Sequence, residues 1–205
     1  MKKRLHDKKA GIAILISLIV IALAEIIFRA AAMGLEAILT TANFGEQLAV
    51  IALAVTILVL TAKGKDRACY ICYGAWIAYF VLDQFFEIPG MLLDFVNRFG
   101  MSGIGTIGVA ARILSMFLIV AIGVLLVEYL NDGTICNKAF NVLCVATVLL
   151  LAVGIATSVY SAVTVETRLL LDVFNNIYRL IMVLLTTFFA YDSAKMQLKK
   201  TNLTK

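Results

Sequence analysis

The stretch Asp172–Arg179 (DVFNNIYR) opens the last long apolar segment of this 205-residue chain. Four of its side chains recur at i, i+3, i+4 and i+7, which places them on one stripe of a helix. They are Asp172, Asn175, Asn176 and Arg179. The continuation, Leu180–Ala190, carries no charged residue. An acid, two amides and an arginine therefore enter an apolar helix together, and within a bilayer such groups are costly and usually face protein or water.

The composition of the chain indicates an integral membrane protein. Hydrophobic residues make up 62% of it and charged residues 15%, whereas a soluble domain is about half apolar and about a quarter charged. The net charge is +5. The basic residues stand in short runs beside apolar segments, which is typical of the loops that flank membrane-spanning helices. We therefore expect the lipid bilayer, and no nucleic acid, as a partner.

Six apolar segments each approach the roughly 20 residues that a membrane-spanning helix needs. They cover residues 10–33, 47–63, 68–88, 104–130, 138–163 and 168–191. We predict an all-α fold in which residues 1–205 form a single six-helix transmembrane domain. The first segment contains Glu25 and Arg29, so we expect it to be a retained helix and not a cleaved signal peptide.

The basic residues divide unequally between the two sides of this arrangement. With the N-terminus inside, the inner segments hold Lys2, Lys3, Arg4, Lys8, Lys9, Lys63, Lys65, Arg67, Lys138, Lys195, Lys199, Lys200 and Lys205. The outer loops hold only Arg98 and Arg168. Because cytoplasmic loops carry the excess of lysine and arginine, both termini are predicted to be cytoplasmic. Such flanks suit a bacterial plasma membrane.

A surface helix is predicted after the third segment. Pro89 and Gly90 should end or kink that segment. Residues 91–99 then alternate apolar and charged side chains, with Asp94 and Arg98 at i, i+4. This pattern is typical of a short amphipathic helix lying at the membrane interface.

Several polar side chains share one depth when the helix rise of about 1.5 Å per residue is applied. Glu25, Asp83, Arg112 and Asn176 fall roughly 7 Å outside the midplane, and their polar neighbours lie within about one or two turns of them. In the inner halves of the first, fourth and last segments, the stretches Ile12–Leu23, Met116–Val127 and Leu180–Ala190 carry no ionisable group. This asymmetry predicts a polar pocket open to the outer leaflet. Its candidate ligand-binding residues are Glu25, Arg29, Asp83, Glu87, Arg112, Asp172, Asn175, Asn176 and Arg179.

Three functions are compatible with this layer of charge. Arg112 and Arg179 would suit a carboxylate or phosphate, and Asp83 or Asp172 an amine, so the first hypothesis is a protein that binds a small polar or anionic solute. The second is a structural or regulatory subunit of a larger membrane complex, in which the charges pair with one another. The third is a channel with a hydrophobic gate.

Enzyme activity, cofactors and metals are not expected. The only histidine is His6, in the charged N-terminal tail, which excludes histidine-assisted nucleophiles and metalloprotease motifs within the membrane. Cys69 and Cys72 form a CxxC pair, with Cys136 and Cys144 elsewhere. On the predicted inner side these thiols would face a reducing compartment, so ordinary apolar packing is expected and a redox or metal site is the alternative.

A small six-helix protein with an outward pocket resembles in architecture the substrate-binding subunits of energy-coupling-factor vitamin transporters. The analogy rests on no residue motif and concerns architecture alone. It implies a substrate-binding subunit for transport that works with a membrane-protein partner or as a homo-oligomer.

Overall fold

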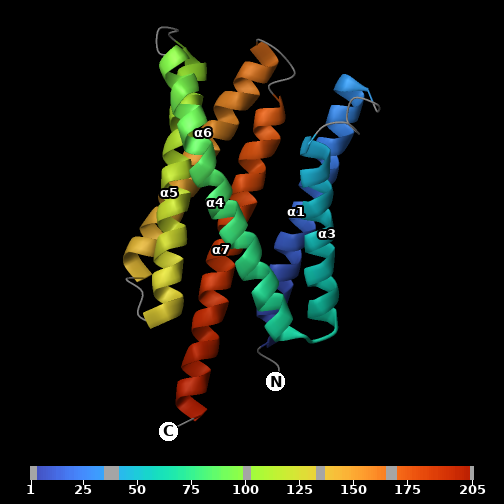
Figure 1. The fold of residues 1–205 in the computed structure, drawn as a ribbon, viewed down its shortest axis with the longest axis vertical. Helices are drawn as coiled ribbons and strands as arrows, with labels where there is room; N and C mark the ends of the chain where they lie inside the picture. Colours follow the sequence, from blue (N-terminus) through green and yellow to red (C-terminus); the bar gives the residue numbers. More distant parts are fainter. Residues whose placement is uncertain (1–3, 35–41, 99–102, 133–136, 165–169, 204–205) are drawn as a thin grey trace. The chain divides into compact units, whose positions relative to one another are not determined.

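The computed structural model describes residues 4–34, 42–98, 103–132, 137–164 and 170–203. These residues form six helices: α1 (Arg4–Met33), α3 (Ala42–Ala62), α4 (Asp66–Arg98), α5 (Ile104–Asp132), α6 (Asn137–Thr164) and α7 (Leu170–Leu203) (Figure 1). They contain no strand. Each helix includes a stretch long and apolar enough to cross a membrane. The prediction of an all-α integral membrane protein with six spanning helices is confirmed, and the cytoplasmic location of the termini stays a prediction.

Helix α4 corrects one part of the prediction. It continues as a single helix through Pro89 to Arg98, so Pro89 does not end it and residues 91–98 form its last turns. Proline removes one helical N–H and crowds the preceding turn, but membrane helices tolerate it because neighbouring groups satisfy the freed carbonyl. The separate surface helix is therefore not an element of the described residues.

The chain divides into two compact units, Met1–Ala75 and Trp76–Lys205. In the first unit, α1 packs along α3 (Figure 1). Leu15, Leu18 and Ala22 of α1 and Ala54 and Ile57 of α3 are buried. Their recurrence every three or four residues gives each helix one apolar seam. Whether the chain functions as a single domain stays a prediction.

In the second unit, α5 packs on α6, and α7 packs on both. Glycines permit close approach here. A Cβ added at Gly108 of α5 would lie 2.6 Å from Thr157 Oγ1 of α6, and one added at Gly123 of α5 would lie 2.7 Å from Val81 Cγ1 of α4. Small residues at such crossings allow helices to pack tightly in membranes. Helix α5 thereby packs closely against α6 at Gly108 and against α4 at Gly123.

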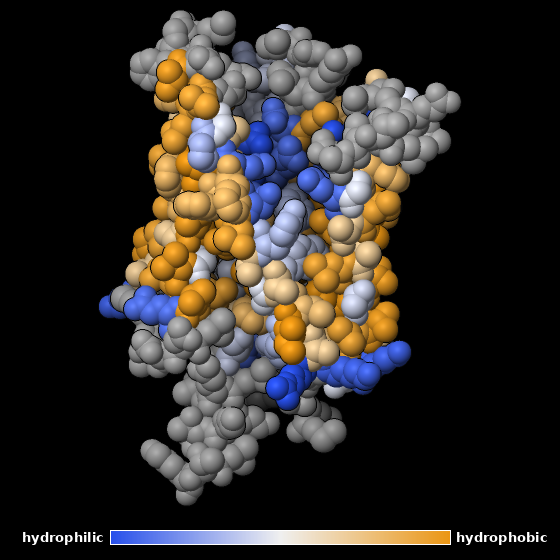
Figure 2. All heavy atoms as spheres, in the orientation of Figure 1, coloured by the Kyte–Doolittle hydropathy of each residue, from blue (hydrophilic) through white to orange (hydrophobic). Residues whose placement is uncertain are grey.

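The surface of the helices matches a lipid environment. Figure 2 shows hydrophobic side chains over most of the visible flanks of α1 and α3 in one unit, and of α5 and α6 in the other. Large apolar residues such as Ile27, Val124, Val145 and Val163 are exposed. An exposed apolar surface of this kind is unfavourable in water and is the surface that hydrocarbon accepts.

Candidate functional site

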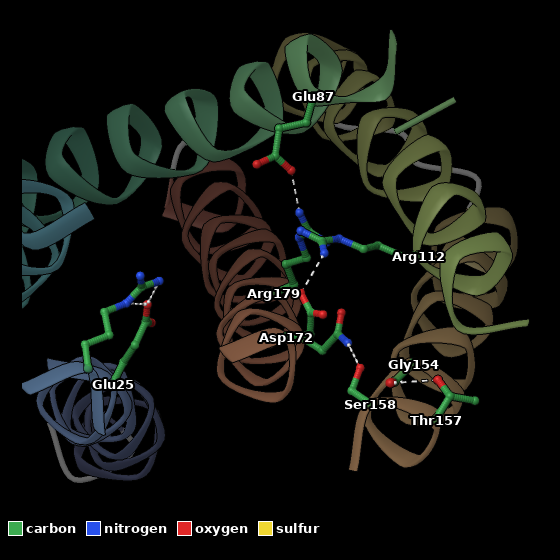
Figure 3. Close-up of polar contacts among 10 residues, drawn as sticks. Glu25, Glu87, Arg112, Gly154, Thr157, Ser158, Asp172 and Arg179 are labelled. Carbon is green, nitrogen blue, oxygen red and sulfur yellow. Dashed lines mark hydrogen bonds and ion pairs between the residues drawn. The ribbon is translucent and has the colours of Figure 1, made fainter. Parts of the chain in front are cut away.

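Two ion pairs join three helices of the second unit. Arg112 of α5 donates from Nη1 to Asp172 Oδ1 of α7 at 3.1 Å. Arg179 of α7 donates from Nη2 to Glu87 Oε2 of α4 at 2.5 Å (Figure 3). These contacts link α4, α5 and α7 through their side chains.

The arginines of these pairs lie deeper than the acids. The side chain of Arg179 is 4% exposed and that of Arg112 is 19% exposed, whereas Glu87 and Asp172 are 42% and 43% exposed. Arg179 also interacts electrostatically with Arg112 and with Asp83. Two cations therefore lie near each other, with carboxylates placed towards the more exposed side.

The pairs do not satisfy every polar atom around them. Arg112 Nε, Arg179 Nη1, Asn176 Oδ1 and Gln84 Oε1 are buried without a hydrogen-bond partner among the described residues. An unpaired buried polar group costs about 1–3 kcal/mol, and more when it is charged. The cluster therefore retains two guanidinium donors and two amide acceptors that are not used by hydrogen bonds among the described residues.

Helix α6 adds residues that the sequence analysis did not assign to the site. Asn176 Nδ2 donates to Ser158 Oγ at 3.3 Å. Gly154, one turn before Ser158, makes room for this amide, because a Cβ there would lie 3.3 Å from Asn176 Nδ2. The signal in the sequence is a glycine and a serine four residues apart in an apolar helix, which is also a common packing pattern.

Asp83 is the acid of this cluster that has no ion pair within the described residues. It is half-buried and accepts a hydrogen bond from Gln84 Nε2 at 3.1 Å. Its negative charge is repelled by that of Glu87 and attracted by the positive charge of Arg179. Asn175 is half-buried on α7. Asp83, Glu87, Arg112, Asp172, Asn175, Asn176 and Arg179 thus all belong to the second unit.

Glu25 and Arg29 belong to the first unit, where they form a group of their own. Glu25 Oε1 accepts from Arg29 Nε at 2.9 Å and from Arg29 Nη2 at 2.6 Å. Glu25 Oε2 accepts from Gln47 Nε2 of α3 at 2.8 Å. Gln47 was not among the residues predicted from the sequence, because it lies near the start of an apolar segment that has no charge in its apolar part. The candidate residues are therefore divided between the two units.

Three of the four cysteines lie in the described residues. Cys69, Cys72 and Cys144 are free thiols, and Cys69 and Cys144 are buried. Cys144 accepts a hydrogen bond from Thr187 at 3.5 Å. Cys136 lies outside the described residues. Within the described ranges, no three His, Cys, Asp or Glu side chains are arranged to hold a metal ion.

Comparison with protein-family models, with curated proteins and with solved structures finds no match to this chain. The function is therefore inferred from the chemistry of these side chains.

Proposed function

We propose that the second unit binds a small polar or anionic solute through Arg112 and Arg179. One observation carries this proposal: two arginines on different helices each keep a buried N–H group without an acceptor, Arg112 Nε and Arg179 Nη1. A carboxylate or phosphate oxygen is the natural acceptor, since a guanidinium donates to such oxygens in parallel hydrogen bonds.

Hydrogen bonds from the two arginines would contribute to the affinity for an anion. A hydrogen bond to a charged group contributes about 1.5–3 kcal/mol. An anion that accepts from both arginines would gain about 3–6 kcal/mol and would remove the cost of two unpaired donors. Asn176 Oδ1 offers an acceptor for an N–H or O–H group of the same solute.

The role that best fits such a site is that of a substrate-binding subunit for transport. We propose that it works with a membrane-protein partner or as a homo-oligomer. The basic flanks of the helices support cytoplasmic termini and an outward-facing site in a bacterial plasma membrane.

A structural or regulatory subunit is the second candidate, and one observation favours it. Each arginine of the two groups already has a carboxylate partner: Arg29 with Glu25, Arg112 with Asp172 and Arg179 with Glu87. Ion pairs of this kind hold helices together without any ligand. The two candidates differ in what the unpaired N–H groups contact. A binding site has a solute there, whereas a structural cluster has water.

Native mass spectrometry of the gently purified protein separates the two candidates. We expect the wild type to retain a small solute, and Arg179→Gln to weaken that retention about 10- to 100-fold, the equivalent of one charge-assisted hydrogen bond. Charge reversal in Arg179→Glu should abolish retention. Arg112→Gln tests the second arginine independently if either Arg179 variant fails to fold.

Arg29→Gln is the matched control, since it removes an arginine whose ion pair lies in the first unit. It should retain the solute like the wild type. A wild-type protein that carries no solute, or equal loss in Arg29→Gln and Arg179→Gln, would refute the proposal and favour the structural candidate.

A further inference from the structure

The turn between α3 and α4 carries three basic residues in the first unit. Lys63, Lys65 and Arg67 are all exposed. The turn separates the candidate spans Phe44–Ala62 and Arg67–Leu93, so it lies where two helices leave the hydrocarbon. The sequence places one acid, Asp66, among them, which leaves the turn positively charged.

The backbone of this turn is fixed by a recognisable helix end. Gly64 has φ of +67°, donates to Thr61 O at 3.2 Å, and is followed by Lys65 N, which donates to Leu60 O at 3.0 Å. This pair of bonds is the Schellman motif, in which glycine takes the left-handed position. Lys65 O in turn accepts from Cys69 N at 3.1 Å in the first turn of α4. Lys65 is therefore held at both its N–H and its carbonyl.

A shallow hollow of about 580 Å³, broadly open to its surroundings, lies against this turn. It is lined by Gly64, Lys65, Arg67, Ala68 and Ile71. Ile71 stands one helical turn after Arg67 and is 64% exposed. The hollow thus has a cationic end at the turn and an apolar wall that continues along α4 into the span.

We infer that this hollow binds an anionic phospholipid. Lys65 and Arg67 contact the phosphate and head group, and Ile71 contacts the first carbons of an acyl chain. Basic residues beside a span attract anionic lipids, and arginine can donate to two phosphate oxygens at once. Free phosphate would use the cationic end alone, whereas a lipid also covers the apolar wall. This inference is independent of the proposed solute site.

Native mass spectrometry with added lipid tests the inference. Phosphatidylglycerol and phosphatidylcholine with identical acyl chains are titrated into the detergent-solubilised protein. We expect phosphatidylglycerol to bind in preference, and Arg67→Gln to weaken its binding about 5-fold, the contribution typical of one basic residue near a membrane surface. Lys65→Gln should act in the same direction and replaces Arg67→Gln if that variant does not fold.

Lys138→Gln is the control, because it removes an exposed lysine at the end of another span. It should leave lipid binding within 2-fold of the wild type, as should millimolar inorganic phosphate added as competitor. Equal binding of the two lipids, an equal loss in Lys138→Gln, or displacement of the lipid by inorganic phosphate would each overturn the inference.

Discussion

Arg29 in the first unit and Arg179 in the second unit are both paired with glutamate, but their surroundings differ. Arg29 donates from two nitrogens to Glu25, four residues earlier on the same helix, and Gln47 uses the other oxygen of Glu25. Arg179 donates to Glu87 of a different helix and keeps Nη1 buried without a partner. Among the described residues, every buried side-chain polar atom that lacks a partner lies in the second unit.

Both groups contain ion pairs, but they differ in whether all their buried polar atoms are hydrogen-bonded. Residues at i and i+4 of one helix meet in a geometry that the helix itself sets. A pair across helices depends on how the helices pack, and here Arg112 and Arg179 each make one contact of this kind. We interpret the complete group as structural and the incomplete one as functional.

The largest effect on stability is expected from Glu25→Ala. Glu25 is 2% exposed, and its removal leaves Arg29 and Gln47 without their acceptor. Breaking a buried pair in this way should lower the free energy of unfolding by about 3 kcal/mol, measured by denaturant titration in detergent. The variant that still folds should retain solute. An effect no larger than that of the exposed Glu128→Gln would remove the structural role from Glu25.

An intermediate effect is expected from Gly108→Ala. The new Cβ would lie 2.6 Å from Thr157 Oγ1, and overpacking of this kind costs about 1–3 kcal/mol. Because Arg112 lies one turn further along α5, solute retention should fall as well. Gly108→Ala/Thr157→Ala should recover most of both losses.

Gly90→Ala is the matched control for this substitution, since nothing lies within 4 Å of a Cβ at that position. In a helix it should be neutral or stabilise by up to about 1 kcal/mol. If Gly108→Ala behaves like Gly90→Ala, the close contact of α5 with α6 does not position Arg112.

The smallest effect is expected from Ser158→Ala. It removes the acceptor of the Asn176 Nδ2 hydrogen bond, and such interhelical bonds in membranes contribute about 0.6 kcal/mol on average. Solute retention should change several-fold, because the Asn176 amide is then free to rotate. Thr164→Ala is the control, because the Thr164 hydroxyl donates to Tyr160 O of its own helix. It should change neither the free energy of unfolding nor solute retention. Matching results for the two variants would exclude Asn176 from the site.

Much of the fold follows from the sequence because one physical quantity dominates it. Bilayer thickness sets the length of each apolar segment. The helix rise predicts that Arg112 and Glu87 lie at about the same depth as the polar residues of α7. Which residues pair across helices does not follow, because it depends on which helices become neighbours. Glu25 and Arg29 stand at i and i+4 of one helix, a spacing at which side chains meet, whereas the bond from Gln47 to Glu25 depends on how α3 packs against α1.

The residues that were missed share a property. Ser158, Gly154 and Gln84 carry no charge, so nothing distinguishes them from the many small or polar residues of apolar helices. The effect of Pro89 was overestimated, because proline strongly disrupts an isolated helix. Helix α4 continues past Pro89 for nine residues to Arg98.

The central claim is that Arg112 Nε and Arg179 Nη1 donate to one bound solute. A high-resolution experimental structure of the gently purified protein tests it directly. We predict a single non-protein density, larger than water, within hydrogen-bond distance of both nitrogens and reaching Asn176 Oδ1. Separate water molecules on each nitrogen, or both nitrogens bonded to carboxylates of the protein, would contradict the claim.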